Sequence, residues 1–164
     1  MEINKFGGVF MNREEIKQIL KFYKNVDDEI RLNTRIINNL EQAYCLMSCG
    51  SILENMLKNK YKKSSPTETA ALNVPFSVSE TIREYTMLNK RLNNIKTEIT
   101  KEYNKLPYLQ KEIIYDFYIQ GFRWANISVR TNYSVTQCKI IRNRGLDKLT
   151  RLFSQNTVIL KFFS

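Results

Sequence analysis

Side chains that can hydrogen-bond DNA bases gather on one side of the segment that follows Ser134. Hydroxyl, amide and cationic groups on an exposed helical face are the groups that contact base edges in the major groove. The candidate base-reading residues are Val135, Thr136, Gln137, Lys139, Ile140, Arg142 and Asn143. The candidate phosphate-binding residues, which would supply affinity without sequence preference, are Arg130, Ser134, Arg144, Lys148 and Arg151.

Three short helices would position these side chains, and the residues between them predict two sharp breaks. The first helix begins near Pro107, because proline suits a first helical turn, and it ends at Gly121. A second helix follows, and Asn132 can adopt the left-handed conformation that ends it. Ser134 is a good N-cap for a third helix that runs to about Phe153. Two helices joined by so short a turn, the second one basic, are typical of a helix-turn-helix.

The third helix separates into an inward and an outward side. The residues predicted to pack inward share one helical stripe, and they are Ser134, Cys138, Ile141, Gly145, Leu146 and Leu149. Between Leu106 and Phe153, eight lysines and arginines outnumber three acidic residues. This charge favours DNA as a partner, although any basic protein can carry such cations simply as a solvated helix face.

The same stretch resembles region four of bacterial sigma factors, and more closely the sigma-region-four-like domain of ArpU- and RinA-type phage transcriptional regulators. The resemblance covers about the last third of the chain and is carried by the runs IIYDFYIQG, FRWANI and YSVTQCKIIRNRGLDKL. Within the third run the matching residues are Tyr133, Ser134, Gln137, Ile141, Arg142, Asn143, Arg144, Leu146, Lys148 and Leu149. The resemblance implies sequence-specific binding of promoter or operator DNA, with RNA polymerase as a further partner.

Four positions depart from the pattern of those regulators. Arg123 stands where a serine or threonine usually caps the second helix, and Thr131 stands where an aliphatic residue packs. Asn132 replaces a glycine, and Gly145 replaces an alanine. Glycine inside a helix costs about 1 kcal/mol relative to alanine. These four residues are expected to affect how precisely the helices of the motif are positioned, but not whether the motif forms.

The segments before this motif are expected to be long helices, so the predicted fold class is all-α. We divide the chain into a long N-terminal helical segment (1–63), a linker (64–77), a second long helix (78–105), the sigma-region-four-like domain (106–153) and an apolar tail (154–164). The two long segments predict a helical hairpin or coiled-coil region before the helix-turn-helix. Asn12 is the expected cap of the first helix, and Gly50 marks where that helix would bend or break. Met11 resembles a more natural start than residues 1–10 provide.

Apolar residues on the second long helix alternate at spacings of three and four, with Glu102 as the one interruption, and they are Tyr85, Leu88, Leu92, Ile95, Ile99 and Leu106. Such a seam must be buried against something. The first helix can cover part of it in an antiparallel hairpin, and a second copy of the chain can cover the rest. We therefore expect a homodimer, with a closed monomeric hairpin as the alternative. The apolar tail either folds back onto a core or joins an interface.

Composition narrows the function. The net charge of +10 favours an anionic partner, and nucleic acid is a commoner anionic partner than a membrane surface. No apolar run reaches the length needed to cross a bilayer, and the first residues lack a signal-peptide core. We expect a cytoplasmic protein with reduced thiols, in which Cys45 and Cys49 are small buried residues rather than metal ligands. No nucleophile motif or metal-ligand spacing is present, so we expect no enzyme, cofactor or metal.

Three functions remain open at this stage. The leading hypothesis is a phage or prophage DNA-binding transcriptional regulator that reads its site with the third helix. A second is a DNA-packaging oligomer resembling a small terminase subunit, which also joins a helix-turn-helix to oligomerising helices. A third is an adaptor that binds RNA polymerase and never contacts DNA.

Overall fold

The computed structural model describes residues 11–58 and 76–163. Every element in these two ranges is helical, which confirms the all-α prediction. The expected N-terminal extension (1–10), most of the expected linker (64–75) and the side chain of Cys49, predicted to be buried, lie outside the part of the chain that the structure describes. No helix among the described residues is both long enough and apolar enough to cross a membrane.

Helix α1, Arg13–Lys58, is 46 residues long. Its cap is Asn12, as predicted: Oδ1 of Asn12 accepts from the backbone N–H of Glu15, and the Glu15 carboxylate accepts from the N–H of Asn12. This reciprocal pair satisfies donors that have no partner inside the helix. The helix continues through Gly50 without a break, so the alternative of two helices is not observed. The side chain of Cys45 is exposed, and the prediction that it is buried is wrong.

Helix α3, Phe76–Tyr103, begins two residues earlier than the predicted boundary, so Phe76 and Ser77, which were assigned to the linker (64–77), lie in its first turn. The second half of its predicted seam is buried, and the buried members are Leu92, Ile95, Ile99 and, beyond the helix end, Leu106. The first half is different. Tyr85 is only half-buried, and Leu88 is 37% exposed.

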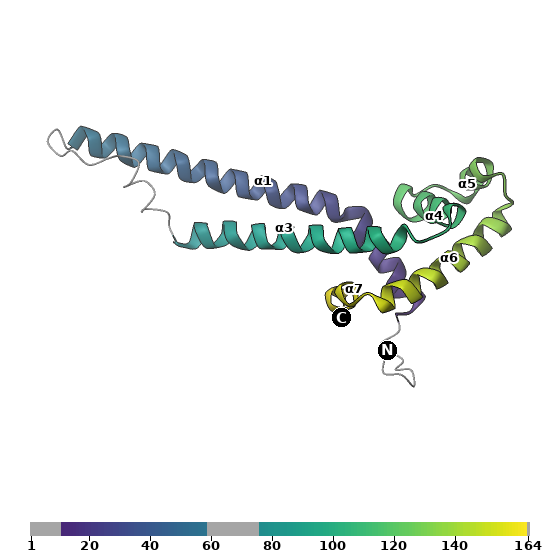
Figure 1. Cartoon of the computed structure of the whole chain (residues 1–164). Helices are drawn as coiled ribbons and strands as arrows, with labels where there is room; N and C mark the ends of the chain where they lie inside the picture. Colours follow the sequence, from purple (N-terminus) through teal and green to yellow (C-terminus); the bar gives the residue numbers. More distant parts are fainter. Residues whose placement is uncertain (1–10, 59–75, 164) are drawn as a thin grey trace. The chain divides into compact units, whose positions relative to one another are not determined.

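The chain forms two compact units, whose boundary falls inside both long helices. Unit 1 contains residues 11–27 and 92–163, and unit 2 contains the described residues between 28 and 91. In unit 2 the two helices lie side by side (Figure 1), and Nδ2 of the buried Asn33 donates to Oδ1 of Asn89 at 3.0 Å. The antiparallel hairpin that the sequence predicted is therefore present.

In unit 1 two polar contacts join α1 and α3 and show that the helices are antiparallel. The Tyr23 hydroxyl lies 3.1 Å from the Thr100 hydroxyl, and Nζ of Lys96 lies 2.6 Å from the carboxylate of Asp27. Residues nearer the start of α1 thus meet residues nearer the end of α3. This pairing brings Ile16 and Leu20 close to the segment that follows α3.

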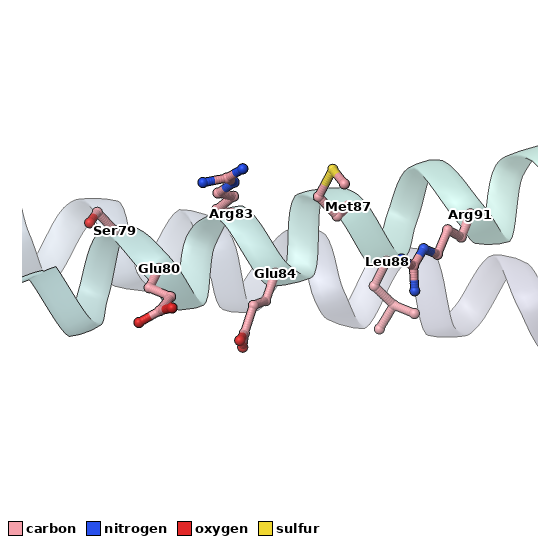
Figure 2. Close-up of a pocket in the computed structure, with 7 residues that line it drawn as sticks. All are labelled: Ser79, Glu80, Arg83, Glu84, Met87, Leu88 and Arg91. Carbon is pink, nitrogen blue, oxygen red and sulfur yellow. The ribbon is translucent and has the colours of Figure 1, made fainter.

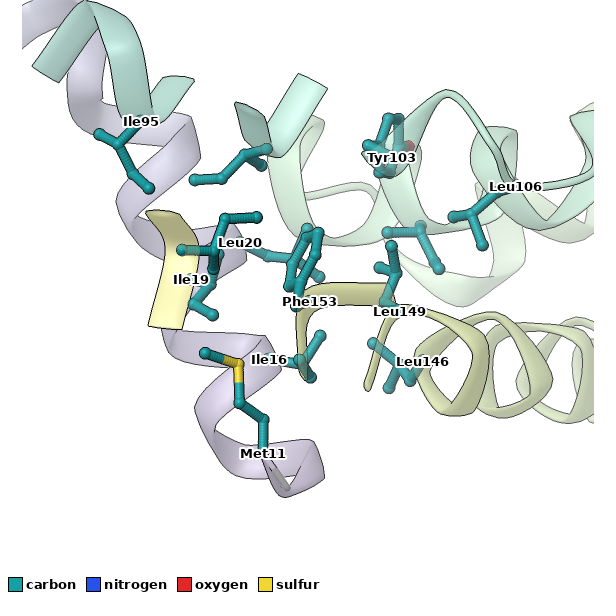
Figure 3. Packing of buried hydrophobic residues seen from close by; sticks show 13 residues of the cluster. Met11, Ile16, Ile19, Leu20, Ile95, Tyr103, Leu106, Leu146, Leu149 and Phe153 are labelled. Atoms are coloured by element: carbon teal, nitrogen blue, oxygen red, sulfur yellow. The ribbon is translucent and has the colours of Figure 1, made fainter. Parts of the chain in front are cut away.

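The main core of unit 1 draws on distant parts of the sequence (Figure 3). Its buried residues are Met11, Ile16, Ile19, Leu20, Ile95, Ile99, Tyr103, Leu106, Ile114, Leu146, Leu149, Phe153 and Ile159. Helix α7, Thr157–Phe163, folds back so that Ile159 is fully buried, which resolves the two alternatives for the apolar tail. The expected domain 106–153 is consequently not a compact unit by itself, because Leu149 and Phe153 share this core with Leu20.

Four helical segments complete unit 1, and they are α4 (Tyr108–Ile114), the π-helix η1 (Tyr115–Gln120), α5 (Trp124–Thr131) and α6 (Val135–Gln155). A second, smaller core holds them together, formed by the buried Ile113, Ile127 and Cys138. Half-buried aromatic residues close it, among them Phe117 and Trp124. Since α4, α5 and α6 each contribute one of the three buried residues, this small core fixes how the three helices pack together.

Candidate nucleic-acid interface

The two breaks around α5 form as the sequence predicts. Gly121 has φ of 74° and ends η1, and Asn132 has φ of 58° and ends α5. Both values lie in the left-handed region, where glycine has no steric cost and asparagine is tolerated. The hydroxyl of Ser128 donates to the carbonyl of Tyr133 at 2.6 Å, which ties the turn back onto α5.

The start of α6 is fixed by a capping box. The hydroxyl of Ser134 accepts from the backbone N–H of Gln137, and the Gln137 side chain accepts from the N–H of Ser134 at 3.2 Å. Two residues predicted to contact DNA therefore have a structural role in the free protein. Ser134 keeps its exposed position at the helix N-terminus, where phosphate oxygens bind well.

The outward face of α6 contains most of the predicted contacts. Thr136 and Ile140 are exposed, the latter with 46% of its surface accessible, and Val135 is half-buried beside them. Along the same helix the exposed cations are Lys139, Arg144, Lys148 and Arg151. Among the residues that the structure describes, Arg144, Lys148 and Arg151 form no ion pair, so their charges face solvent unneutralised.

One acid on α6, Asp147, would repel phosphate from this surface, and Arg13 compensates its charge although the Asp147 side chain stays 45% exposed. Arg13 donates to both of its carboxylate oxygens, at 2.6 and 2.8 Å. The hydrogen bond and the charge of Asp147 raise the pKa of Arg13 above its ordinary value. Sequence reasoning missed this role of Arg13, and no local signal could have revealed it, because the two residues are 134 positions apart.

Arg142 and Asn143 form a fixed pair at the edge of α6. The guanidinium of Arg142 lies 5.1 Å from the ring centre of Trp124 and 5.6 Å from that of Phe117, which itself stacks on Trp124 at 4.4 Å. Its nitrogens also donate to Oδ1 of Asn143 at 2.9 and 3.2 Å. Nζ of Lys139 lies 5.8 Å from the same Trp124 ring. Arg142 is thus half-buried against an aromatic stack, whereas Lys139 remains exposed.

Arg130, predicted to bind phosphate, is held by a buried acid. Its Nε lies 3.2 Å from Oδ2 of Asp116, and its guanidinium lies 5.2 Å from the ring centre of Phe122. Asp116 is almost fully buried on η1, and the contact is an ion pair without hydrogen-bond alignment. A signal for this burial was present in the sequence, because Asp116 lies three residues after the apolar Ile113 and so falls on the same side of the helix.

A buried tyrosine packs near this acid. The hydroxyl of Tyr103 donates to the carbonyl of Lys111 at 2.5 Å, and only 8% of the residue is exposed. Burial raises the pKa of the Tyr103 phenol, and the nearby Tyr23, Tyr115 and Asp116 raise it further. The folded protein therefore favours the neutral form of the Tyr103 phenol.

Thr131 and Gly145, which depart from the sigma-region-four-like pattern, have local structural reasons, whereas the structure gives none for Arg123. Thr131 is half-buried in place of an aliphatic residue, and its hydroxyl donates to the carbonyl of Ile127 at 2.8 Å. Gly145 lies where α6 crosses α4, and a Cβ at this position would come within 2.7 Å of Cδ1 of Ile114. Arg123 occupies the N-cap position of α5 without a capping bond from its side chain. Glycine at 145 thus permits the close approach of the two helices.

In this geometry an exposed, cationic helix face is held in place by capping, by an aromatic stack and by the core of unit 1. Comparisons with protein-family models, with curated proteins and with solved structures found no match to this chain.

Proposed function

We propose that this chain is a sequence-specific, double-stranded-DNA-binding transcriptional regulator of the phage or prophage type. The observation that carries the proposal is the outward face of α6, where Thr136, Ile140 and Asn143 lie among cations that have no acidic partner in the described part of the chain. A helix of this kind, entered from a capped turn, fits the major groove of B-form DNA. A cytoplasmic location and binding to promoter or operator sites go with this proposal.

The exposure and hydrogen-bonding capacity of each side chain decide whether we propose it as a phosphate contact or as a base contact. Arg144, Lys148 and Arg151 neutralise phosphates and supply affinity that depends on salt. Thr136 and Asn143 offer hydrogen bonds to base edges, and the methyl groups of Ile140 can contact the thymine methyl. Ser134 adds a hydroxyl at the helix N-terminus, where the helix dipole favours an anion. Base contacts then provide specificity, and phosphate contacts provide register.

The test begins with selection of bound sites from random duplexes. The proposal expects a defined site, and binding to it should weaken as salt rises, with a slope of about −0.9 per phosphate contact on logarithmic axes. The chain contains a single tryptophan, Trp124, which lies beside Lys139 and Arg142. Its emission should change on binding the selected duplex. Recovery of no preferred sequence would contradict the proposal.

One observation favours the adaptor as a second candidate. Val129 on α5 is 79% exposed, and Tyr133 in the following turn is 40% exposed. Exposed apolar side chains near a charged face are suited to contact with another protein, and RNA polymerase is the partner that the family resemblance implies. The adaptor would be favoured over the regulator if the affinity for DNA did not depend on salt concentration and the chain also bound polymerase with an affinity that does not depend on salt.

A further inference from the structure

Four exposed side chains in unit 2 lie on one face of α3. They are Glu84, Met87, Leu88 and Arg91, whose spacing of three, one and three residues puts them on the same side of a helix. Met87 is 47% exposed and Leu88 is 37% exposed. Figure 2 shows Glu84 and Arg91 on either side of Met87 and Leu88. With Ser79, Glu80 and Arg83 these side chains line a shallow groove.

Contacts among the described residues of unit 2 do not account for this face. Helix α1 packs on a different side of α3, where Asn33 bonds to Asn89. Among the described residues, neither Glu84 nor Arg91 has an ion-pair partner. Two large apolar side chains and two charges of opposite sign are therefore presented together.

The order of these residues is what identifies a partner. Along α3 it reads acid, apolar, apolar, base, so the face becomes complementary to itself when a second identical helix runs in the opposite direction. Centred between Met87 and Leu88, such a pair places Glu84 of each copy opposite Arg91 of the other copy, and Met87 opposite Leu88. A parallel pair would place Glu84 against Glu84 and Arg91 against Arg91, which is repulsive.

We propose that this face of α3 binds a second copy of the same chain across a two-fold axis, with the two α3 helices antiparallel. Such an interface is isologous, because each contact occurs twice with the roles of the copies exchanged. Four residues per copy make a small interface, so the dimer is weak, with a dissociation constant on the order of micromolar. The inference concerns assembly alone and does not depend on the proposal for DNA.

Charge reversal in sedimentation velocity tests the pairing. The unmodified chain, of 19.5 kDa, should shift towards twice that mass as its concentration rises through the micromolar range. Glu84→Arg and Arg91→Glu should each weaken self-association at least tenfold, because each creates two like-charge contacts across the axis. An equimolar mixture of these two variants should dimerise, because a copy with arginine at both positions then meets a copy with glutamate at both. The variant that carries both changes should dimerise again, because the charges are exchanged and remain complementary.

Restoration in the mixture also shows that each single variant is folded. Lys90→Glu, which makes the same change of charge as Arg91→Glu at an exposed position beside the patch, should leave the association unchanged. A chain that stays monomeric at high concentration would overturn the proposal. So would a dimer that Glu84→Arg leaves intact, or a mixture that associates no better than its components, since either would assign the interface to a different surface. None of these measurements contains DNA.

Discussion

The guanidinium of Arg142 lies 5.1 Å from the ring centre of Trp124, and it donates two hydrogen bonds to Oδ1 of Asn143. Trp124 belongs to α5 and the other two residues belong to α6. The stack therefore orients an amide on the neighbouring helix before any DNA is bound. Because Oδ1 already accepts from Arg142, the Nδ2 hydrogens are what Asn143 can offer, and acceptors such as N7 and O6 of guanine suit them.

Asn143→Ala should relax sequence preference by about 1–3 kcal/mol at one base pair of the selected site. Arg142→Lys keeps the charge but lacks the planar fork that stacks and donates twice. It should relax preference at the same base pair, with little change in salt dependence. Fluorescence anisotropy titrations on the selected duplex and its single-base variants measure both effects. Changes at two different base pairs would show that Arg142 does not position Asn143.

Lys148→Ala should weaken binding to the selected duplex and to an unrelated duplex by the same factor. Lys148 is exposed on α6 and is a phosphate contact under the proposed function, so its removal should reduce the steepness of the salt dependence by about 0.9 on logarithmic axes. Lys90→Ala removes the same charge from an exposed site in unit 2 and serves as the control. A loss confined to the selected duplex would reassign Lys148 to base reading.

Gly145→Ala should destabilise the protein even though alanine favours helix. The added Cβ would lie 2.7 Å from Cδ1 of Ile114 and 3.3 Å from Cβ of Gln110. Overpacking of this kind costs about 1–3 kcal/mol, against a gain of about 1 kcal/mol in helix propensity. Urea denaturation with coincident probes measures the difference.

The companion change Ile114→Val gives the matched test, because valine lacks the Cδ1 atom in question. In the Ile114→Val background, Gly145→Ala should cost less than it does in the unmodified protein, or even stabilise. Equal costs in the two backgrounds would mean that the close contact with Ile114 is not what keeps glycine at this position.

We expect the stability of the protein to decline at alkaline pH because of Tyr103. Its pKa is raised in the folded protein above the ordinary value of 10.0, chiefly by burial. As the pH rises, the Tyr103 phenol therefore ionises in the unfolded chain before it does so in the folded protein. Its contribution to the free energy of unfolding is complete below pH 10 and is lost as the pH rises towards the folded-state pKa. Tyr103→Phe should cost about 1 kcal/mol at neutral pH, through the lost hydrogen bond, and should show a shallower decline above pH 10.

Tyr108→Phe is the control for this pH dependence, since Tyr108 is 74% exposed. It should leave the alkaline decline unchanged. Denaturant midpoints measured at intervals from neutral pH to beyond pH 10 provide the comparison. An identical decline in the Tyr103→Phe protein would assign the alkaline loss to other groups, such as the lysines that form ion pairs.

Short-range rules were enough to predict the helix-turn-helix itself. Gly121 and Asn132 end their helices because few other residues accept a left-handed backbone, and Ser134 starts α6 because its hydroxyl reaches a free N–H. The antiparallel hairpin followed from the apolar spacing on α3. The helix ends and the cap depend on residues within a few positions of one another, so they can be predicted without a structure, and the seam on α3 shows only that this helix needs an apolar partner.

Other features depend on partners that are distant in sequence. The backbone N–H of Met11 donates to the hydroxyl of Ser154, a contact across 143 positions, and nothing local indicates it. Arg142 was grouped with the outward residues, but it lies four positions after the buried Cys138 and so leans towards the aromatic stack. Stricter use of the helical repeat would have placed it there. The exposure of Leu88 could not be predicted, because the seam alone does not say how far α1 covers it.

The position of Ile159 in the same core as Ile16 has a consequence for biosynthesis. A ribosome releases residues 11–20 long before it releases residues 157–163, so the first apolar turns of α1 cannot be fully covered until α7 has been made. During that interval α4, α5 and the beginning of α6 can pair locally, while Leu149 and Phe153 stay incompletely enclosed. A nascent chain that stalls before α7 would leave that apolar surface open to chaperones and proteases.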